Sequence, residues 1–126
     1  MARAAVTAST NREALLGHQA LSVETVELGA ETVIVLRGEF DLTGVELFRT
    51  AVARVTPTDA LVLDMRGLSF LDSSGLGCLV DVYRRAQSEG WSLVLTSPQC
   101  AVTAILRLTG LYERLEIIEA GPHRIS

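Results

Sequence analysis

Two adjacent hydroxyl side chains, Ser73 and Ser74, lie in the sequence D-S-S-G at positions 72–75. The short apolar run L-V-L-D at 61–64 predicts a buried strand before them, and Asp72 is a residue type that begins helices. The first turn of a helix has unpaired backbone N–H groups and favours negative charge. A phosphate on either serine would add about -1.5 to -2 charges to the surface offered to a partner. Taken alone, the four residues favour a plain helix cap, because short motifs often match by chance.

Other site chemistries find little support in the sequence. The nucleophile pattern G-x-S-x-G is absent around the serines, and His18 and His123 lie near the two ends of the sequence. Gly-rich phosphate-binding patterns are also absent, and two cysteines and two histidines at these spacings form no zinc ligand set. We therefore expect no enzyme activity, no metal and no cofactor.

Length and composition indicate one domain. The chain has 126 residues, of which 48% are hydrophobic and 21% charged, which is typical of a globular fold. A formal net charge of -4 argues against nucleic acid as a direct partner. The sequence has two cysteines without a CxxC pair and no apolar run near the ~20 residues of a membrane helix, so we expect a cytoplasmic protein without membrane contact.

Strand and helix patterns alternate along the chain. Apolar and β-branched runs predict strands at 21–28, 32–37, 60–64, 91–96 and 115–118. Helix signals lie between them: a T-x-x-E capping box at Thr43, a start at Asp72 with an end at Gly90, and a start at Ser97-Pro98 with an end at Gly110. The segments 38–42 and 67–71 are expected to be loops. This order predicts an α/β fold with a small mixed, mostly parallel sheet flanked by helices.

The predicted domain spans residues 21–120. Residues 1–20 have little periodicity and many small polar side chains, so we expect a flexible extension with at most a helical turn at 12–16. Residues 121–126 are expected to be a polar tail.

Three stretches carry a family resemblance. G-E-F-D-L at 38–42 and L-V-L-D-M-R-G-L-S-F-L-D-S-S-G-L-G at 61–77 resemble the two signature stretches of the STAS domain, and most of all its bacterial anti-sigma-factor antagonist branch. L-R-L-T-G-L at 106–111 is similar to a later segment of that family. The similarity covers about residues 22 to 118. The sequence departs from the family in stopping soon after Ile118, where members usually have another helix, and in its longer N-terminal extension.

The resemblance implies a partner-switching regulator of transcription. In this family the unphosphorylated antagonist binds an anti-sigma factor that is also a serine kinase, and this binding frees the sigma factor. The kinase then phosphorylates a serine in the D-S-[ST]-G turn, which releases the antagonist, and a phosphatase resets it. Two alternatives stay open: a STAS module of another regulatory complex, and a small-ligand sensor without serine phosphorylation.

Carried over to this sequence, the resemblance makes Ser74 the expected phosphate acceptor, with Ser73 as the alternative. The residues expected to bind the partner surround this serine; they are Phe40, Asp41, Asp72, Ser73, Gly75 and Leu76.

Cys78 lies one residue beyond the motif. It could sense oxidation, but a buried small residue is the favoured interpretation, because free cysteines are often part of the core. A disulfide with Cys100 would require Cα atoms within ~7 Å of each other.

Overall fold

The computed structural model describes residues 2–9 and 19–119. The elements follow in chain order: β1 (Ala2–Ser9), β2 (Ser22–Leu28), β3 (Glu31–Phe40), the 3-10 helix η1 (Leu42–Gly44), α2 (Val45–Ala53), β4 (Ala60–Leu71), α3 (Ser73–Glu89), β5 (Ser92–Thr96), α4 (Cys100–Leu108), α5 (Leu111–Arg114) and β6 (Glu116–Ile118).

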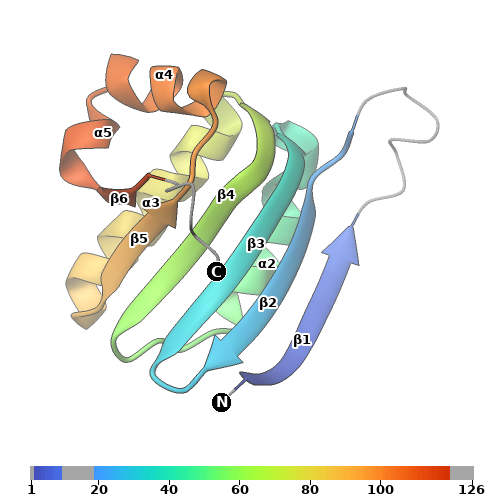
Figure 1. Ribbon diagram of the computed structural model, residues 1–126, viewed down its shortest axis with the longest axis vertical. Coiled ribbons are helices and arrows are strands. Elements are labelled where there is room, and N and C mark those ends of the chain that lie inside the picture. Colours follow the sequence, from blue (N-terminus) through green and yellow to red (C-terminus); the bar gives the residue numbers. More distant parts are fainter. Residues whose placement is uncertain (1, 10–18, 120–126) are drawn as a thin grey trace.

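The six strands form one sheet in the order β1-β2-β3-β4-β5-β6. The pairs β1–β2 and β2–β3 are antiparallel, and the remaining three pairs are parallel. Helices α2 and α3 cover one face of the sheet, whereas α4 and α5 join β5 to β6 at its upper end (Figure 1). The predicted α/β fold with a mixed, mostly parallel sheet is confirmed.

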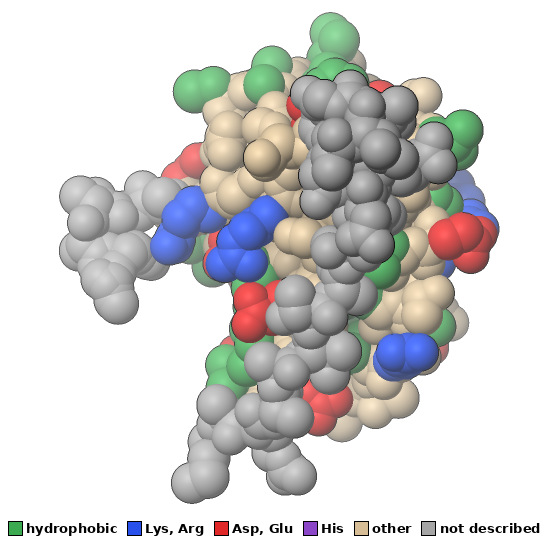
Figure 2. Space-filling view, turned by 90° about the vertical axis from the view of Figure 1, so that its right-hand side faces the viewer, with side chains coloured by type: hydrophobic (Ala, Val, Ile, Leu, Met, Phe, Trp, Pro, Cys, Tyr) green, Lys and Arg blue, Asp and Glu red, His purple; other side chains and the backbone are tan. Residues whose placement is uncertain are grey.

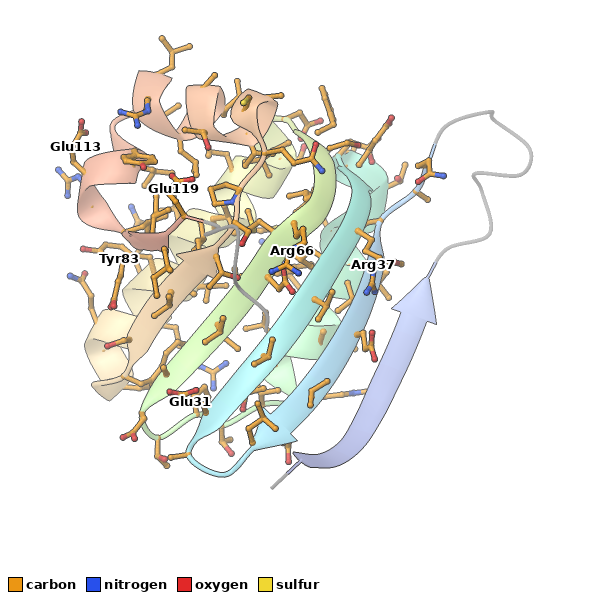
Figure 3. All side chains as sticks on the ribbon, in the orientation of Figure 1. Glu31, Arg37, Arg66, Tyr83, Glu113 and Glu119 are labelled. Atoms are coloured by element: carbon orange, nitrogen blue, oxygen red, sulfur yellow. The ribbon has the colours of Figure 1, made fainter. Side chains whose placement is uncertain are left out.

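Alternation along the strands explains this layering. Every second residue of β3, and of β4 up to Met65, points toward α2 and α3 and is buried. The buried apolar side chains of these elements include Ile34, Leu36, Phe40, Leu61, Leu63 and Met65 from the strands and Phe48, Val52, Leu79 and Val82 from the helices. The opposite face carries charged side chains such as Arg37 on β3 and Arg66 on β4 (Figure 3).

Arg85 of α3 joins the two covering helices. Its guanidinium donates hydrogen bonds to the main-chain carbonyls of Val52 and Val55, at 2.9 Å each, just where α2 ends. The same side chain pairs with Glu89 at 3.0 Å and lies 5.4 Å from the centre of the Trp91 ring. Arg85 therefore ties α3 to the end of α2, where it adds a donor to the Val52 carbonyl, which also accepts from the Val55 N–H at 3.2 Å.

The prediction of an extension without regular structure is wrong for residues 2–9. They form strand β1, which pairs antiparallel with β2. Their sequence has no strong period of its own, but the edge of β2 offers a row of unpaired backbone groups that a neighbouring segment can use. The suggested helical turn at 12–16 lies outside the described residues, and the domain limits at 21 and 120 stay predictions.

The two segments predicted as loops are the ends of long strands. β3 continues to Phe40 and β4 to Leu71, with register shifts between Val35 and Arg37 and again between Gly38 and Glu39. Gly38 has a positive φ of 93°, and a Cβ there would lie 2.4 Å from the carbonyl oxygen of Ala20. The glycines that suggested loops thus mark irregular pairing and close approach of the backbone within the sheet.

The predicted capping box at Thr43 and Glu46 is also wrong. Asp41 caps η1 instead, since its Oδ1 accepts from the Thr43 N–H at 3.0 Å and from the Thr43 hydroxyl at 2.6 Å. α2 begins after Gly44 without a side-chain cap. The Thr43 hydroxyl thus donates to Asp41, two positions before it, and does not cap α2.

The last of the three predicted helices, α4, begins later than predicted and ends where predicted. α4 begins at Cys100 after Gln99, whereas Ser97 is buried with a φ of 56° and donates its N–H to the Ile118 carbonyl at 2.8 Å. Gly90 and Gly110 follow α3 and α4 in the left-handed conformation that commonly ends helices.

Candidate functional site

The D-S-S-G turn lies where the parallel strands β3 and β4 end side by side (Figure 1). Phe40 and Leu71 are paired at these ends, and the Asp72 N–H donates to the Phe40 carbonyl at 3.2 Å. An aspartate directly follows each of these strands: Asp41 follows β3 and Asp72 follows β4. Residues far apart in the sequence thus meet at the carboxyl end of the sheet, where α/β proteins commonly bind their ligands.

Asp72 caps helix α3, as the sequence predicts. Its backbone is extended, and its Oδ1 accepts hydrogen bonds from the N–H groups of Ser74 at 2.8 Å and Gly75 at 3.2 Å. Two of the unpaired N–H groups at this helix start are therefore already satisfied. A phosphate at the turn would benefit from the helix dipole, but it would have to compete with the Asp72 carboxylate for these two donors.

The two serine hydroxyls are accessible. Ser73 is exposed and Ser74 is half-buried in the first turn of α3. Within the described part of the chain, neither hydroxyl makes a hydrogen bond, so the fold places no demand on either side chain.

Phe40 supports this turn from beneath. Its side chain is fully buried, and its ring centre lies 5.0 Å from that of Phe48. The helix face of β3 turns the ring into the core of the free protein, and the predicted contact of Phe40 with a partner stays a prediction.

Gly75 is buried for a packing reason. A Cβ at this position would lie 2.6 Å from Cδ1 of Leu71 and 2.9 Å from Cγ of Phe40. The glycine therefore lets the first turn of α3 lie directly on the ends of β3 and β4. Its predicted role as a surface contact does not fit this burial, whereas Leu76 is half-buried and Asp41 and Asp72 are partly exposed.

The match to known proteins decides the family. The family model described as "Mlab, STAS domain" matches residues 23–119, which is most of the chain. The chain belongs to the STAS domain family. A STAS-domain containing protein of Pseudomonas aeruginosa is 32% identical over 90 residues, which cover 71% of this chain and 89% of that protein. A Mycobacterium tuberculosis protein named as a candidate anti-anti-sigma factor is 33% identical over 104 residues, or 79% of this chain and 70% of that one.

A solved structure shows the same STAS fold. The unphosphorylated form of the anti-sigma factor antagonist SpoIIAA superposes with a TM-score of 0.69 at 23% identity, covering 79% of this chain and 89% of that chain. β1 lies outside the segment that the family model matches.

One exposed apolar residue of the STAS site is missing from the sequence-based set. Leu42, between Asp41 and Thr43, is 73% exposed. It belongs to η1, which contacts α3. Its place directly after the G-E-F-D sequence was the available clue, but the pattern alone does not distinguish an outward leucine from a buried one.

Cys78 of the STAS domain is buried and free, and Cys100 is exposed and free. Burial raises the pKa of the Cys78 thiol, and the neighbouring Arg49 guanidinium acts in the opposite direction. A buried thiol with a raised pKa fits the interpretation of a core residue better than that of an oxidation sensor. No disulfide joins the two cysteines.

The surroundings of the turn limit its chemistry. Among residues 2–9 and 19–119, no group of three or more histidine, cysteine or acidic side chains could hold a metal ion. No helix in this same part of the chain combines the length and apolarity needed to cross a membrane. What the turn offers is a pair of accessible hydroxyls, two aspartates and an exposed leucine.

Proposed function

We propose that this STAS protein is an anti-sigma-factor antagonist whose binding is controlled by phosphorylation of Ser74. In the unphosphorylated state it binds an anti-sigma factor that is also a serine kinase, and thereby frees the sigma factor. The observation that supports this most is the Ser73–Ser74 pair, which lies at the end of β4 in the capped first turn of α3 and is not buried.

The proposed reaction is catalysed by the partner. The kinase transfers the γ-phosphoryl group of ATP to the Ser74 oxygen, ADP leaves, and the hydroxyl proton passes to a base of the kinase. A phosphatase later hydrolyses the phosphoserine. The antagonist contributes only the substrate serine, in keeping with the lack of a triad or metal site in the sequence.

The geometry gives a reason for release. The carboxylate of Asp72 already accepts from the Ser74 and Gly75 N–H groups, and Asp41 lies at the adjoining strand end. A phosphoserine here would meet two like charges with few local donors left to compensate it. Covering that dianion with a partner would require desolvation without matching hydrogen bonds, so the complex would dissociate faster.

The test is the intact mass of the protein after incubation with ATP and each purified anti-sigma kinase of the same genome. Wild type, Ser74→Ala and Ser73→Ala are compared. We expect one added phosphate in wild type and Ser73→Ala and none in Ser74→Ala.

A different pattern would change the proposal in a defined way. Loss of phosphate only in Ser73→Ala would move the acceptor by one residue and keep the function. No phosphate with any kinase would overturn the phosphorylation switch. A small molecule retained in native mass spectra would then favour the ligand-sensor alternative.

A further inference from the structure

The face of the sheet opposite α2 and α3 has no described helix over its middle part. We call it the open face; it carries the residues of β2 to β5 that alternate with those buried against the helices. In the described part of the chain, α4 and α5 lie at the upper end of the sheet and leave this middle part uncovered by helices (Figure 1). β3, β4, β5 and β6 pair in parallel, and parallel strands are usually covered on both faces. The architecture therefore indicates that a partner covers the open face.

An apolar band crosses the open face. The strand pairing places four valines side by side on neighbouring strands: Val26, Val33, Val62 and Val94. Val94 is buried, whereas the other three are partly exposed. Two of the five exposed large hydrophobic side chains of the described residues flank this band on the same face, Leu28 at 39% and Ile118 at 48% exposure. Contiguous apolar surface of this kind is typical of interaction sites, unlike single exposed residues.

Opposite charges lie at the two ends of the open face. Arg37 of β3 and Arg66 of β4 are exposed at its upper end, and Glu31, the first residue of β3, is exposed at its lower end (Figure 3). β4 pairs Gly67 with Arg37, so the neighbouring Arg66 lies level with Arg37. Six positions separate Glu31 from Arg37, which is about 20 Å along a strand. Figure 2 views the sheet from its β1 edge, and at the left margin basic side chains lie above hydrophobic ones.

Between these ends, the charged side chains of β2, β3 and β4 on the open face have partners within the chain. Glu24 pairs with Arg37 at 3.4 Å, and Asp64 accepts from the Arg66 N–H at 3.0 Å. Among the ion pairs of residues 2–9 and 19–119, none includes the Arg66 guanidinium or the Glu31 carboxylate. The open face therefore offers an unpaired cation at one end of its apolar band and an unpaired anion at the other.

A second copy of the chain complements this pattern. A two-fold axis that crosses β3 at Ile34, parallel to the sheet and at right angles to the strands, would lay two open faces on each other with their strands antiparallel. Glu31 precedes Ile34 by three positions and Arg37 follows it by three, so each end meets the opposite end of the other copy. The apolar bands then meet in the centre, and Arg66 of each copy approaches Glu31 of the other. Strands running in the same direction would instead bring like charges together, which disfavours that arrangement.

We propose that the protein forms a symmetric dimer in which the open faces of two copies pack with antiparallel strands, stabilised by the valine bands and by two Arg66–Glu31 pairs. Sheets that pack face to face lie about 10 Å apart, a gap that interdigitating valines fill and an arginine side chain can cross. This inference does not rest on the proposed function. Ser74 lies in the first turn of α3, on the other side of the sheet, so both D-S-S-G turns stay uncovered, at opposite ends of the dimer.

Sedimentation velocity of the full chain tests the dimer over concentrations from about 1 μM to about 1 mM, and wild type should change from monomer to dimer within this range. Arg66→Glu and Glu31→Arg each turn two attractive contacts into repulsive ones, so each variant alone should dimerise at least about tenfold more weakly. Their one-to-one mixture should form a mixed dimer of near wild-type affinity, because both of its contacts again join opposite charges. Native mass spectrometry separates this mixed dimer from the two homodimers by mass, and circular dichroism checks that each variant is folded.

Two matched variants make the same charge changes elsewhere. Arg84→Glu on α3 and Glu113→Arg on α5 alter exposed side chains away from the open face, so both should dimerise like wild type. A wild type that stays monomeric up to about 1 mM would overturn the proposal and leave the open face to another protein or to residues 120–126. A wild-type dimer that both charge reversals leave unchanged, or a mixture of folded variants without mixed dimers, would overturn the proposed interface. None of these outcomes bears on phosphorylation of Ser74, so the proposed function is tested separately.

Discussion

The same substitution two residues apart should have opposite effects on stability. At Gly75, an added Cβ would lie 2.6 Å from Leu71 Cδ1, 2.9 Å from Phe40 Cγ and 3.0 Å from the Phe40 carbonyl oxygen. Ordinary carbon contacts are about 3.5–4.0 Å, so the surroundings must move by about an ångström. The carbonyl is restrained, because it also accepts from the Asp72 N–H at 3.2 Å.

The magnitude follows from general values for these two effects. Overpacking of a close contact costs about 1–3 kcal/mol, so Gly75→Ala should lower the free energy of unfolding by that amount. At Gly77 the methyl group enters open space, and the helix gains up to about 1 kcal/mol. The two variants should therefore differ by about 1–4 kcal/mol.

Urea denaturation followed by circular dichroism measures both variants on one scale. Gly75→Ala should unfold at a lower urea concentration than wild type and Gly77→Ala at a higher one, with unchanged slopes. Equal midpoints for the two variants would refute the close packing of α3 on the ends of β3 and β4.

Three further predictions concern the supports of the site. Asp72→Ala removes the cap of α3 and should cost about 1–2 kcal/mol in thermal unfolding, whereas Asp72→Asn should retain most of the stability. Arg85→Met removes the donors to two carbonyls at the end of α2 and should lower the free energy of unfolding in urea by about 1–3 kcal/mol; an unchanged urea midpoint would contradict the stabilising role of these bonds. Iodoacetamide should alkylate the exposed Cys100 in the native protein. It should alkylate the buried Cys78 only in denaturant, because burial shields the thiol and raises its pKa. Mass spectrometry of the peptides distinguishes the two cysteines, and rapid labelling of Cys78 in the native protein would contradict its burial.

The local features of the site could be predicted from the sequence. The cap at Asp72 depends on N–H groups two and three positions further along, so its residue type is enough to indicate it. The left-handed glycines after α3 and α4 are likewise local. Strand and helix periodicity together with the resemblance predicted the fold class.

The features that depend on distant pairing could not be predicted in this way. Phe40 looks like a loop residue until β3 pairs with β4 up to Leu71, and only that pairing buries its ring. The need for glycine at position 75 comes from the same junction. β1 has no distinctive period, and it becomes a strand because the edge of β2 accepts it. Each of these outcomes is set by a neighbour that is distant in the sequence.

The central claim is that phosphorylation of Ser74 controls binding to an anti-sigma factor. The most direct measurement compares the affinity of one purified anti-sigma kinase for the unphosphorylated protein and for the Ser74-phosphorylated protein, separated by ion exchange. The account predicts a loss of at least about a hundredfold on phosphorylation, since the dianion would be covered without matching donors. Equal or tighter binding of the phosphorylated form would contradict it.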